Sequence, residues 1–156
     1  MTTVQPDLLR DLAPDVAAEV LALGFQVHVP TGGELFRLGS AAESVFVIER
    51  GRISLTLPIQ VGGRDEEMLV EERVTGQTVG WSGLIPPHRF TLRAAAPLDT
   101  EVVALPRAAL LSYFAAHPAA GYVVTRNLAS VVGQRLQVFQ AMWLREVQRV
   151  VEARSL

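Results

Sequence analysis

The chain has 156 residues, of which 49% are hydrophobic and 19% charged, and its formal net charge is −2. This length suits a single domain, residues 1–156, and the near-neutral charge gives no general attraction to nucleic acid or to an anionic membrane. Cysteine is absent, which excludes disulfides and thiolate metal sites. The N-terminus lacks the apolar core of a signal peptide, and no run approaches the ~18 apolar residues of a membrane span. A soluble, cytoplasmic protein is therefore expected.

The spacing of apolar residues along the chain changes between residues 1–24 and residues 25–105. Residues 1–24 predict helical structure, because Pro14 can occupy the first turn of a helix that ends at Gly24. From Phe25 the period changes to two, and short strand-like runs follow one another with glycine or proline between them. The last two of these expected strands are RFTLRAAA, residues 89–96, and TEVVALP, residues 100–106. Residues 61–66, VGGRDE, are typical of a hairpin tip. Residues 25–105 are therefore predicted to form a jelly-roll, cupin-like β-barrel, and the fold class is mainly β with flanking helices.

The helical period returns after Leu105. A short helix is predicted over 106–117, and Pro118 separates it from a long helix over 119–153. A helix of this length measures about 50 Å, which is more than one jelly roll can cover. Its second half is therefore expected to pair with the same helix of a second copy, forming a homodimer. This pairing is predicted by a row of apolar residues spaced three or four apart, which we call the seam: Leu128, Val132, Leu136, Phe139, Trp143, Val147 and Val150.

One segment between two strand-like runs is unusual in composition. Residues 79–92, VGWSGLIPPHRFTL, contain two glycines, two adjacent prolines, a tryptophan, a histidine and an arginine. Glycine and proline at this density define a particular backbone shape. Because binding residues are often carried by shaped loops, the 79–92 segment is the candidate ligand site.

The element order, together with two sequence stretches, resembles a known family. The stretches are GELFRLG, residues 33–39, and VFVIERGRISL, residues 45–55, in which glycines stand where strands turn corners of a roll. Both are similar to the cyclic nucleotide-binding domain found in bacterial transcription regulators of the catabolite activator type and in kinase regulatory subunits. The resemblance covers nearly the whole chain. It implies a non-catalytic ligand-sensing domain that signals through its C-terminal helix.

The resemblance also places the family's phosphate-binding cassette at the 79–92 segment. In the family the cassette opens with Gly-Glu-Leu, forms one helical turn and ends in an arginine. Gly80 matches the first glycine, and Arg89 or His88 matches the arginine, depending on where a gap is placed. Trp81 replaces the glutamate that accepts the ribose hydroxyl in the family, and an indole can only donate. The two prolines also remove two backbone donors.

Two interpretations of the segment remain open. In the first, the domain binds a small anion, an aromatic ligand or a nucleotide, with cyclic AMP and cyclic GMP among the possibilities. In the second, Trp81 and Phe90 belong to the core, Trp81 fills the pocket, and the chain is an interaction and dimerisation module. No cofactor is required by either. The expected ligand-binding residues are Gly80, Trp81, Ser82, Gly83, His88, Arg89 and Phe90.

Other functions fit the sequence less well, and an enzyme ranks third. His28, His88 and His117 never form the His-x-His pair of a metal-binding cupin, so no metal is expected. Ser82 lacks the second glycine of a nucleophile elbow. The chain stops at about the place where a helix-turn-helix begins in regulators, and the mixed charges near its end do not suit a DNA-binding arm. Direct binding to nucleic acid is therefore not expected.

Overall fold

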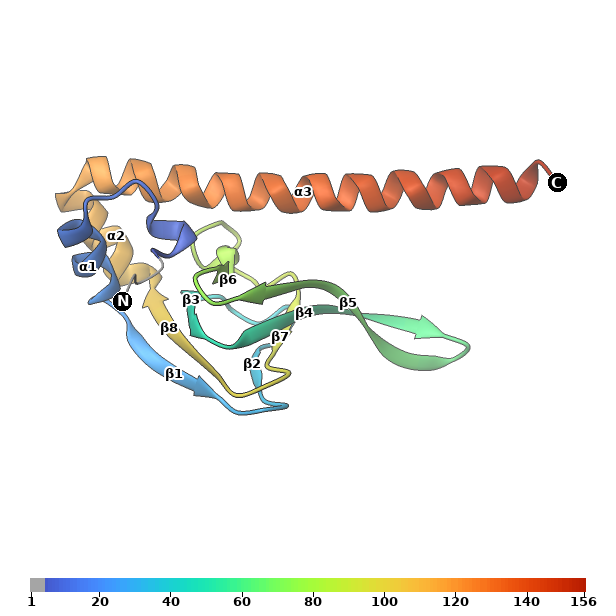
Figure 1. Ribbon diagram of the computed structural model, residues 1–156, viewed down its shortest axis with the longest axis horizontal. Helices are drawn as coiled ribbons and strands as arrows, with labels where there is room; N and C mark the ends of the chain where they lie inside the picture. Colours follow the sequence, from blue (N-terminus) through green and yellow to red (C-terminus); the bar gives the residue numbers. More distant parts are fainter. Residues whose placement is uncertain (1–4) are drawn as a thin grey trace.

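The computed structural model describes residues 5–156 and consists of a β-roll with helices on one side (Figure 1). Residues 1–4, the beginning of the expected N-terminal helical region, lie outside the described residues. The helices are short before the roll and longer after it, as the sequence predicts. They are the 3-10 helix η1 (Asp7–Leu9), α1 (Pro14–Leu21), the 3-10 helix η2 (Trp81–Gly83), α2 (Arg107–Ala116) and α3 (Pro118–Arg154).

The roll is built from eight strands in two four-stranded antiparallel sheets. The strands are β1 (Phe25–Val29), β2 (Glu34–Phe36), β3 (Ser44–Arg50), β4 (Arg52–Val61), β5 (Arg64–Val74), β6 (Thr78–Val79), β7 (Arg93–Ala95) and β8 (Thr100–Pro106). Their order is β1-β8-β3-β6 in one sheet and β2-β7-β4-β5 in the other. The jelly-roll prediction is confirmed, with one difference. The two sheets face each other and are not hydrogen-bonded into a closed barrel.

Side chains that alternate between the two faces of β3 and β8 contribute to two separate hydrophobic cores. Val45 and Val47 of β3 face the helices, and they pack with η1, α1, α2 and the first half of α3. Ile48 and Val102 face the opposite way and contribute to the core between the two sheets. Successive side chains of a strand point to opposite faces of its sheet. The β1-β8-β3-β6 sheet, which we call the wall sheet, therefore separates the helices from the roll interior.

One expected strand is much shorter in the structure. The run RFTLRAAA, residues 89–96, forms a strand only at β7. Before β7 the chain makes single contacts, with an isolated bridge between Ala41 and Arg89 and a backbone hydrogen bond from Phe90 to Ser40. The alternating pattern alone did not reveal this, because apolar residues that face a core from a loop repeat in the same way.

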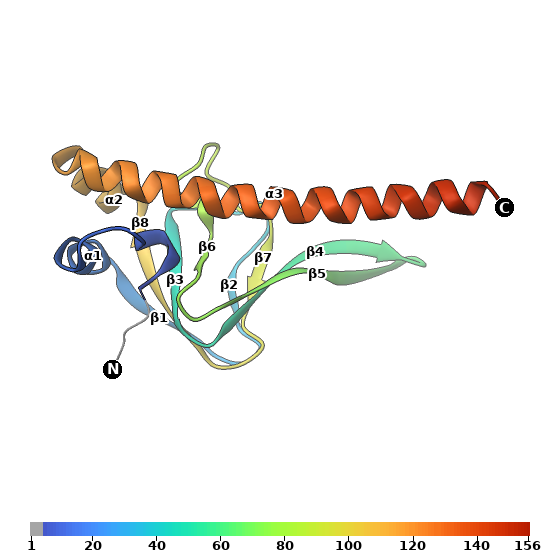
Figure 2. The same ribbon diagram turned by 45° about the horizontal axis from the view of Figure 1, so that its top comes forward.

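The long helix α3 crosses the whole roll and then projects beyond it (Figures 1 and 2). It has 37 residues and a length of about 55 Å. Its buried residues recur at helical spacing and end at Arg135. The hairpin of β4 and β5, which turns at the predicted Gly62-Gly63 tip, projects in the same general direction as α3. One end of the molecule is therefore compact, and the other consists of two projecting elements.

Candidate functional site

The 79–92 segment leaves the roll at β6, forms η2 and returns to β7. Its two glycines are required for different reasons. Gly80 has a φ of +76°, and a Cβ atom there would lie 3.1 Å from Phe46 and 3.2 Å from Phe90. Gly83 lies so close to β3 that a Cβ atom would be 2.5 Å from the Ser44 carbonyl oxygen. These contacts hold η2 against the wall sheet.

Aromatic rings fill the interior of the roll beneath the segment. The rings of Phe36 and Phe90 stack with centroids 3.7 Å apart, and Phe46 lies 5.8 Å from Phe36. The space left between the rings of Phe36 and Phe90, Gly80 and η2 is about 10 Å³. A cavity of this size holds at most one water molecule. The space directly beneath η2 therefore has no room for a nucleotide in this conformation, although a more open pocket of about 500 Å³ lies on the β1 and β2 side of the same rings.

The two basic residues of the segment each donate a hydrogen bond to a backbone carbonyl oxygen. His88 donates a hydrogen bond from Nδ1 to the Ser82 carbonyl oxygen, at 3.0 Å. Arg89 is exposed, and its Nη1 donates to the Gly39 carbonyl oxygen at 3.0 Å. Neither residue lines the small interior cavity. At the other end of the loop, Arg107 of α2 donates to the Gly83 carbonyl oxygen at 3.0 Å.

Trp81 lies between the roll and α3. Its side chain is half-buried and lines an almost wholly apolar groove of about 250 Å³, which we call the roll–helix groove. The sequence-based alternative made Trp81 the residue that fills the pocket. In the structure, stacked phenylalanines fill the roll interior, and Trp81 forms one wall of the groove. The groove is lined by Leu57, Trp81, Thr91, Leu92, Val132, Arg135, Leu136 and Phe139.

Arg135 of α3 is the charged residue of the roll–helix groove, and it also lines the small interior cavity. It is 9% exposed, and its Nε donates to Glu71 Oε2 at 2.9 Å. Its Nη2 is buried without a hydrogen-bond partner among the described residues. Burial lowers the pKa of the Arg135 guanidinium, and the charge of Glu71 acts in the opposite sense. This guanidinium is therefore a buried cation whose Nη2 amino group makes no hydrogen bond to the described residues.

Glu71 connects Arg135 to a second buried arginine. Arg73 Nη1 lies 3.1 Å from Glu71 Oε1, and Arg73 Nη2 lies 3.0 Å from Asp7 Oδ2. Asp7 also accepts hydrogen bonds from the backbone and the hydroxyl of Thr78. This ion-pair network, made of Asp7, Arg73, Glu71 and Arg135, joins η1, β5 and α3. Two positive and two negative charges balance within it.

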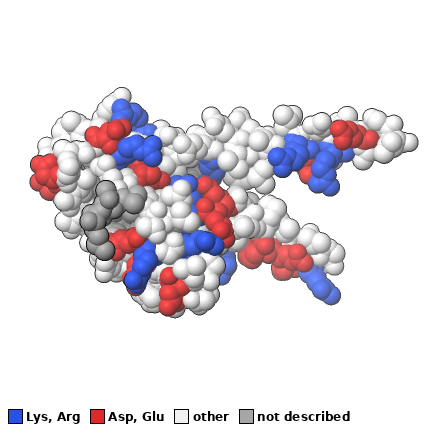
Figure 3. Space-filling view, in the orientation of Figure 1, with Lys and Arg blue, Asp and Glu red and all other residues white. Residues whose placement is uncertain are grey.

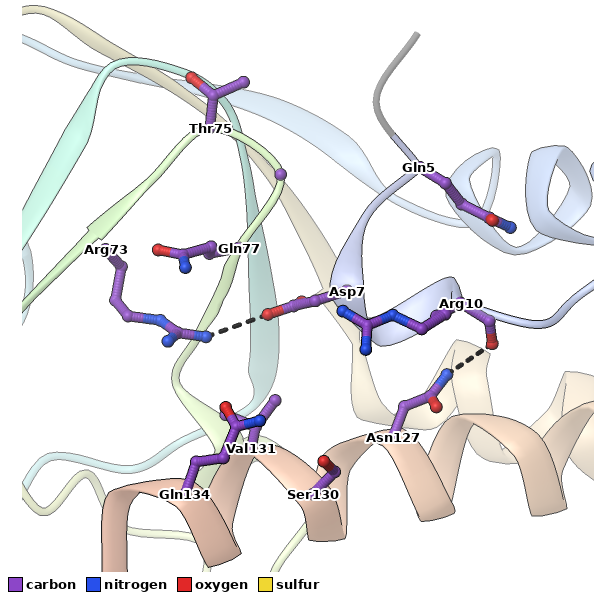
Figure 4. A pocket seen from close by; sticks show the side chains of 11 residues that line it. Gln5, Asp7, Arg10, Arg73, Thr75, Gln77, Asn127, Ser130, Val131 and Gln134 are labelled. Atoms are coloured by element: carbon purple, nitrogen blue, oxygen red, sulfur yellow. Dashed lines mark hydrogen bonds and ion pairs between the residues drawn. The ribbon is translucent and has the colours of Figure 1, made fainter. Parts of the chain in front are cut away.

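A polar cavity of about 250 Å³ lies on the far side of the network (Figure 4). Several of its polar groups are already hydrogen-bonded to one another or to the backbone. Asn127 donates to the carbonyl oxygens of Leu8 and Arg10, and Gln77 accepts a hydrogen bond from the Val74 backbone. The Asn127 bonds attach the N-terminal segment to α3, and the Gln77 bond closes the turn between β5 and β6. The cavity therefore lies where the N-terminal segment, the turn between β5 and β6 and α3 meet.

The structure thus separates the residues that the sequence groups together. Gly80, Trp81, Ser82 and Phe90 line one small cavity. Gly83, His88 and Arg89 do not line it, and their assignment to a ligand stays a prediction. Sequence reasoning missed Arg135, although a signal was present. Val124, Leu128, Val131 and Arg135 follow one buried helical face, and a charge on such a face is unusual.

Within residues 5–156, no group of three or more His, Cys, Asp or Glu side chains lies close enough together to hold a metal ion. In the same part of the chain, no helix is both long enough and apolar enough to cross a membrane.

The sequence and the fold are similar to those of known proteins. The family model of the cyclic nucleotide-binding domain matches residues 26–117. No curated protein matches the chain. The matched residues run from β1 to the end of α2, so they include the whole roll and the 79–92 segment.

Solved structures of similar fold come from several bacteria. The catabolite activator protein of Thermus thermophilus is 23% identical with a TM-score of 0.73, and the alignment covers 91% of this chain and 63% of that protein. The N-terminal domain of a transcriptional regulator from Streptomyces coelicolor is 20% identical with a TM-score of 0.71, covering 88% and 94%. A cyclic nucleotide-binding domain from Methylobacillus flagellatus is 17% identical with a TM-score of 0.71, covering 97% and 82%. At these identities the likeness shows the fold alone.

Proposed function

Because this chain belongs to the cyclic nucleotide-binding domain family, whose fold supports a regulatory, sensory role, we propose that it is a non-catalytic domain that responds to a small ligand where the 79–92 segment meets α3. The response is an altered position of α3, whose projecting half pairs with a second copy of the chain. We treat residues 1–156 as one such domain. Its cytoplasmic location, and a function without direct nucleic-acid contact, stay predictions.

One observation carries this proposal. The same helix that forms a wall of the roll–helix groove continues past Arg135 as an exposed apolar stripe, with Leu136 57%, Trp143 69% and Leu144 64% exposed. Figure 3 shows that this stretch is largely uncharged before a cluster of arginines and glutamates near the end of α3. A change at the groove therefore acts directly on a surface suited to pairing.

Cyclic nucleotides are not the ligands that this geometry favours. Trp81 cannot accept a hydrogen bond from a ribose hydroxyl, and Phe36 and Phe90 occupy the roll interior. Calorimetric titration with cyclic AMP and cyclic GMP is expected to show no binding. Trp81→Glu, which restores an acceptor, is expected not to create binding because the stacked phenylalanines remain. Binding by either protein would refute the claim that the interior is closed.

Pairing through α3 is tested by light scattering over a range of protein concentrations. The wild-type chain is expected to show twice its monomer mass, and Trp143→Glu is expected to show the monomer mass, since a carboxylate would be buried at the seam. Ala141→Glu is the matched control, because it adds the same charge about 160° around the helix. A wild-type monomer at high concentration, or equal effects of the two substitutions, would exclude pairing by this stripe.

The second candidate function is a non-binding interaction module, and the filled roll interior favours it. The two functions differ in what the roll–helix groove does. A sensor requires the groove to accept a small molecule, whereas an interaction module requires only the exposed stripe. The ligand experiment described below separates them, because it measures the groove independently of the mass of the assembly.

A further inference from the structure

We propose that the roll–helix groove binds a small apolar or aromatic monocarboxylate, and that Arg135 is the residue that holds its carboxylate. This inference rests on the proposed sensory function and names the class of ligand. It differs from the expectation based on the 79–92 segment, because the cation comes from α3 and not from Arg89.

The lining of the groove indicates an apolar ligand body. Apart from Thr91 and Arg135, its residues are aliphatic or aromatic, and they come from β4, the 79–92 segment and α3. A ribose or a sugar would lose hydrogen bonds with water that this lining cannot replace. An alkyl chain or a benzene ring would be buried favourably, and a ring could pack against the indole of Trp81. The volume of about 250 Å³ limits the ligand to a small molecule.

Arg135 indicates the charge of the ligand. The residue is more than nine-tenths buried, and its Nη2 has no hydrogen-bond partner among residues 5–156. An unsatisfied donor on a buried charge is costly, and a carboxylate oxygen is the acceptor that a guanidinium binds best. Arg135 donates its hydrogen bond to Glu71 from Nε, not from Nη2. Because Arg135 lines the roll–helix groove, its Nη2 is the nitrogen that we expect a ligand there to engage.

The charge balance of the ion-pair network favours a monoanion. Asp7 and Glu71 already neutralise Arg73 and Arg135. A monocarboxylate would add one negative charge beside this balanced set, and a phosphate monoester would add nearly two. Burying the single extra charge of a monocarboxylate costs less desolvation free energy than burying the nearly double charge of a phosphate monoester. A monocarboxylate thus suits both the lining of the groove and its one cation.

Such a ligand would connect the two walls of the groove. Its apolar body would contact Trp81 and Leu92 on the roll side and Val132 and Phe139 on α3, while its carboxylate would engage Arg135. These contacts span the junction between the packed and the projecting halves of α3. Binding would therefore favour one position of the helix, which is the coupling that a sensory domain requires.

The test uses the two tryptophans of the chain, Trp81 and Trp143. In Trp143→Phe, Trp81 is the remaining indole and reports on the groove by fluorescence. We expect 3-phenylpropionate and hexanoate to change this fluorescence saturably, with calorimetry confirming the binding. The neutral analogues 3-phenylpropanamide and 1-hexanol are expected to bind at least about tenfold more weakly, because they lack the charge-assisted hydrogen bond. Equal binding of acids and neutral analogues would overturn the role of the carboxylate.

Substitutions then identify the residue that holds the acid. Arg135→Gln is expected to weaken binding by at least about tenfold, whereas Arg145→Gln, on the exposed part of α3, should leave it unchanged. Circular dichroism verifies that each variant is folded. If Arg135→Gln does not fold, Val132→Phe gives a second test, because it fills the groove while the cation is retained, and it should abolish binding. Unchanged acid binding in Val132→Phe, or in folded Arg135→Gln, would overturn the proposal.

A second copy of the chain is the competing occupant of the groove. Trp143→Glu distinguishes it, because this variant is expected to be monomeric and also leaves Trp81 as the reporter. Acid binding to both Trp143→Phe and Trp143→Glu supports a ligand site. Binding to the monomeric variant alone, or to neither, would overturn the proposal and leave the paired helix as the explanation. Light scattering decides on pairing separately, so failure of the ligand site and failure of the dimer are distinguishable.

Discussion

The two halves of α3 have similar apolar content and opposite surroundings. Between Pro118 and Arg135 one apolar face is buried against η1, α2 and the wall sheet, and Val124 on this face is completely buried. Beyond Arg135 the same kind of residue is exposed, with Trp143 at 69%. The difference teaches that one hydrophobic repeat can serve two purposes in one helix. The first half holds the domain together, and the second is available to something outside it.

The largest expected effect comes from breaking the packed half. Leu128→Ala should lower the free energy of unfolding by about 2–4 kcal/mol, because Leu128 is 4% exposed and its removal leaves a cavity. Leu144→Ala is the matched substitution in the projecting half, where the leucine is 64% exposed, and it should change this free energy by less than about 0.5 kcal/mol. Urea denaturation of dilute protein measures both. Equal losses would show that the two halves are packed alike.

The next effect concerns the boundary between the halves, where Glu71 holds Arg135. Glu71→Gln should lower the free energy of unfolding by about 1–3 kcal/mol, because two buried arginines lose the carboxylate that they share. Glu66→Gln at the exposed hairpin is the control for loss of one negative charge. Thermal unfolding at neutral pH is the measurement. A loss as small as that of the control would mean that Glu71 contributes little to holding α3.

Hydrogen exchange sharpens the comparison without any substitution. Backbone amides of residues 122–135 should exchange at least about tenfold more slowly than those of residues 141–154, because local opening is easier where no tertiary contacts are made. Mass spectrometry of peptic peptides reports both regions. Raising the protein concentration should slow exchange in the second region selectively if the copies pair there. Uniform protection along α3 in dilute protein would contradict the division into two halves.

The smallest effect is expected at the surface of the projecting half. Arg149 pairs with Glu146 at 3.0 Å, and both side chains are largely exposed. Arg149→Gln should therefore change the free energy of unfolding by no more than about 0.5 kcal/mol, because solvent screens such pairs. Chemical denaturation at two salt concentrations tests this. A substantial, salt-sensitive loss would indicate that the pair belongs to an interface rather than to a free surface.

Much of the fold could be predicted because its signals are local. The change of period at Phe25 and after Leu105 places the roll and the helices to within a few residues. Pro118 marks the start of α3, and the Gly62-Gly63 turn joins β4 to β5. Residues 89–92 were assigned to a strand wrongly, because only hydrogen bonding to a neighbour distinguishes a strand from an apolar loop.

The candidate site was predictable in its place but not in its content. The 79–92 segment is adjacent to α3, and Trp81 is central to it, as the composition suggested. The roles of the individual side chains depended on contacts distant in sequence. Arg89 lies beside Gly39, and Phe90 stacks on Phe36. Such contacts link positions about fifty residues apart, and no periodic pattern contains them.

The sequence by itself determined the order of elements, the family resemblance and the surplus length of the last helix, because these depend on local propensity, periodicity and chain length. Only the tertiary structure decided that the roll interior is filled by phenylalanines, and that the open apolar space lies beside α3 with Arg135 at its wall. The physical reason is that a cavity is what remains after distant side chains have packed. Its position and its charge therefore belong to the folded chain as a whole.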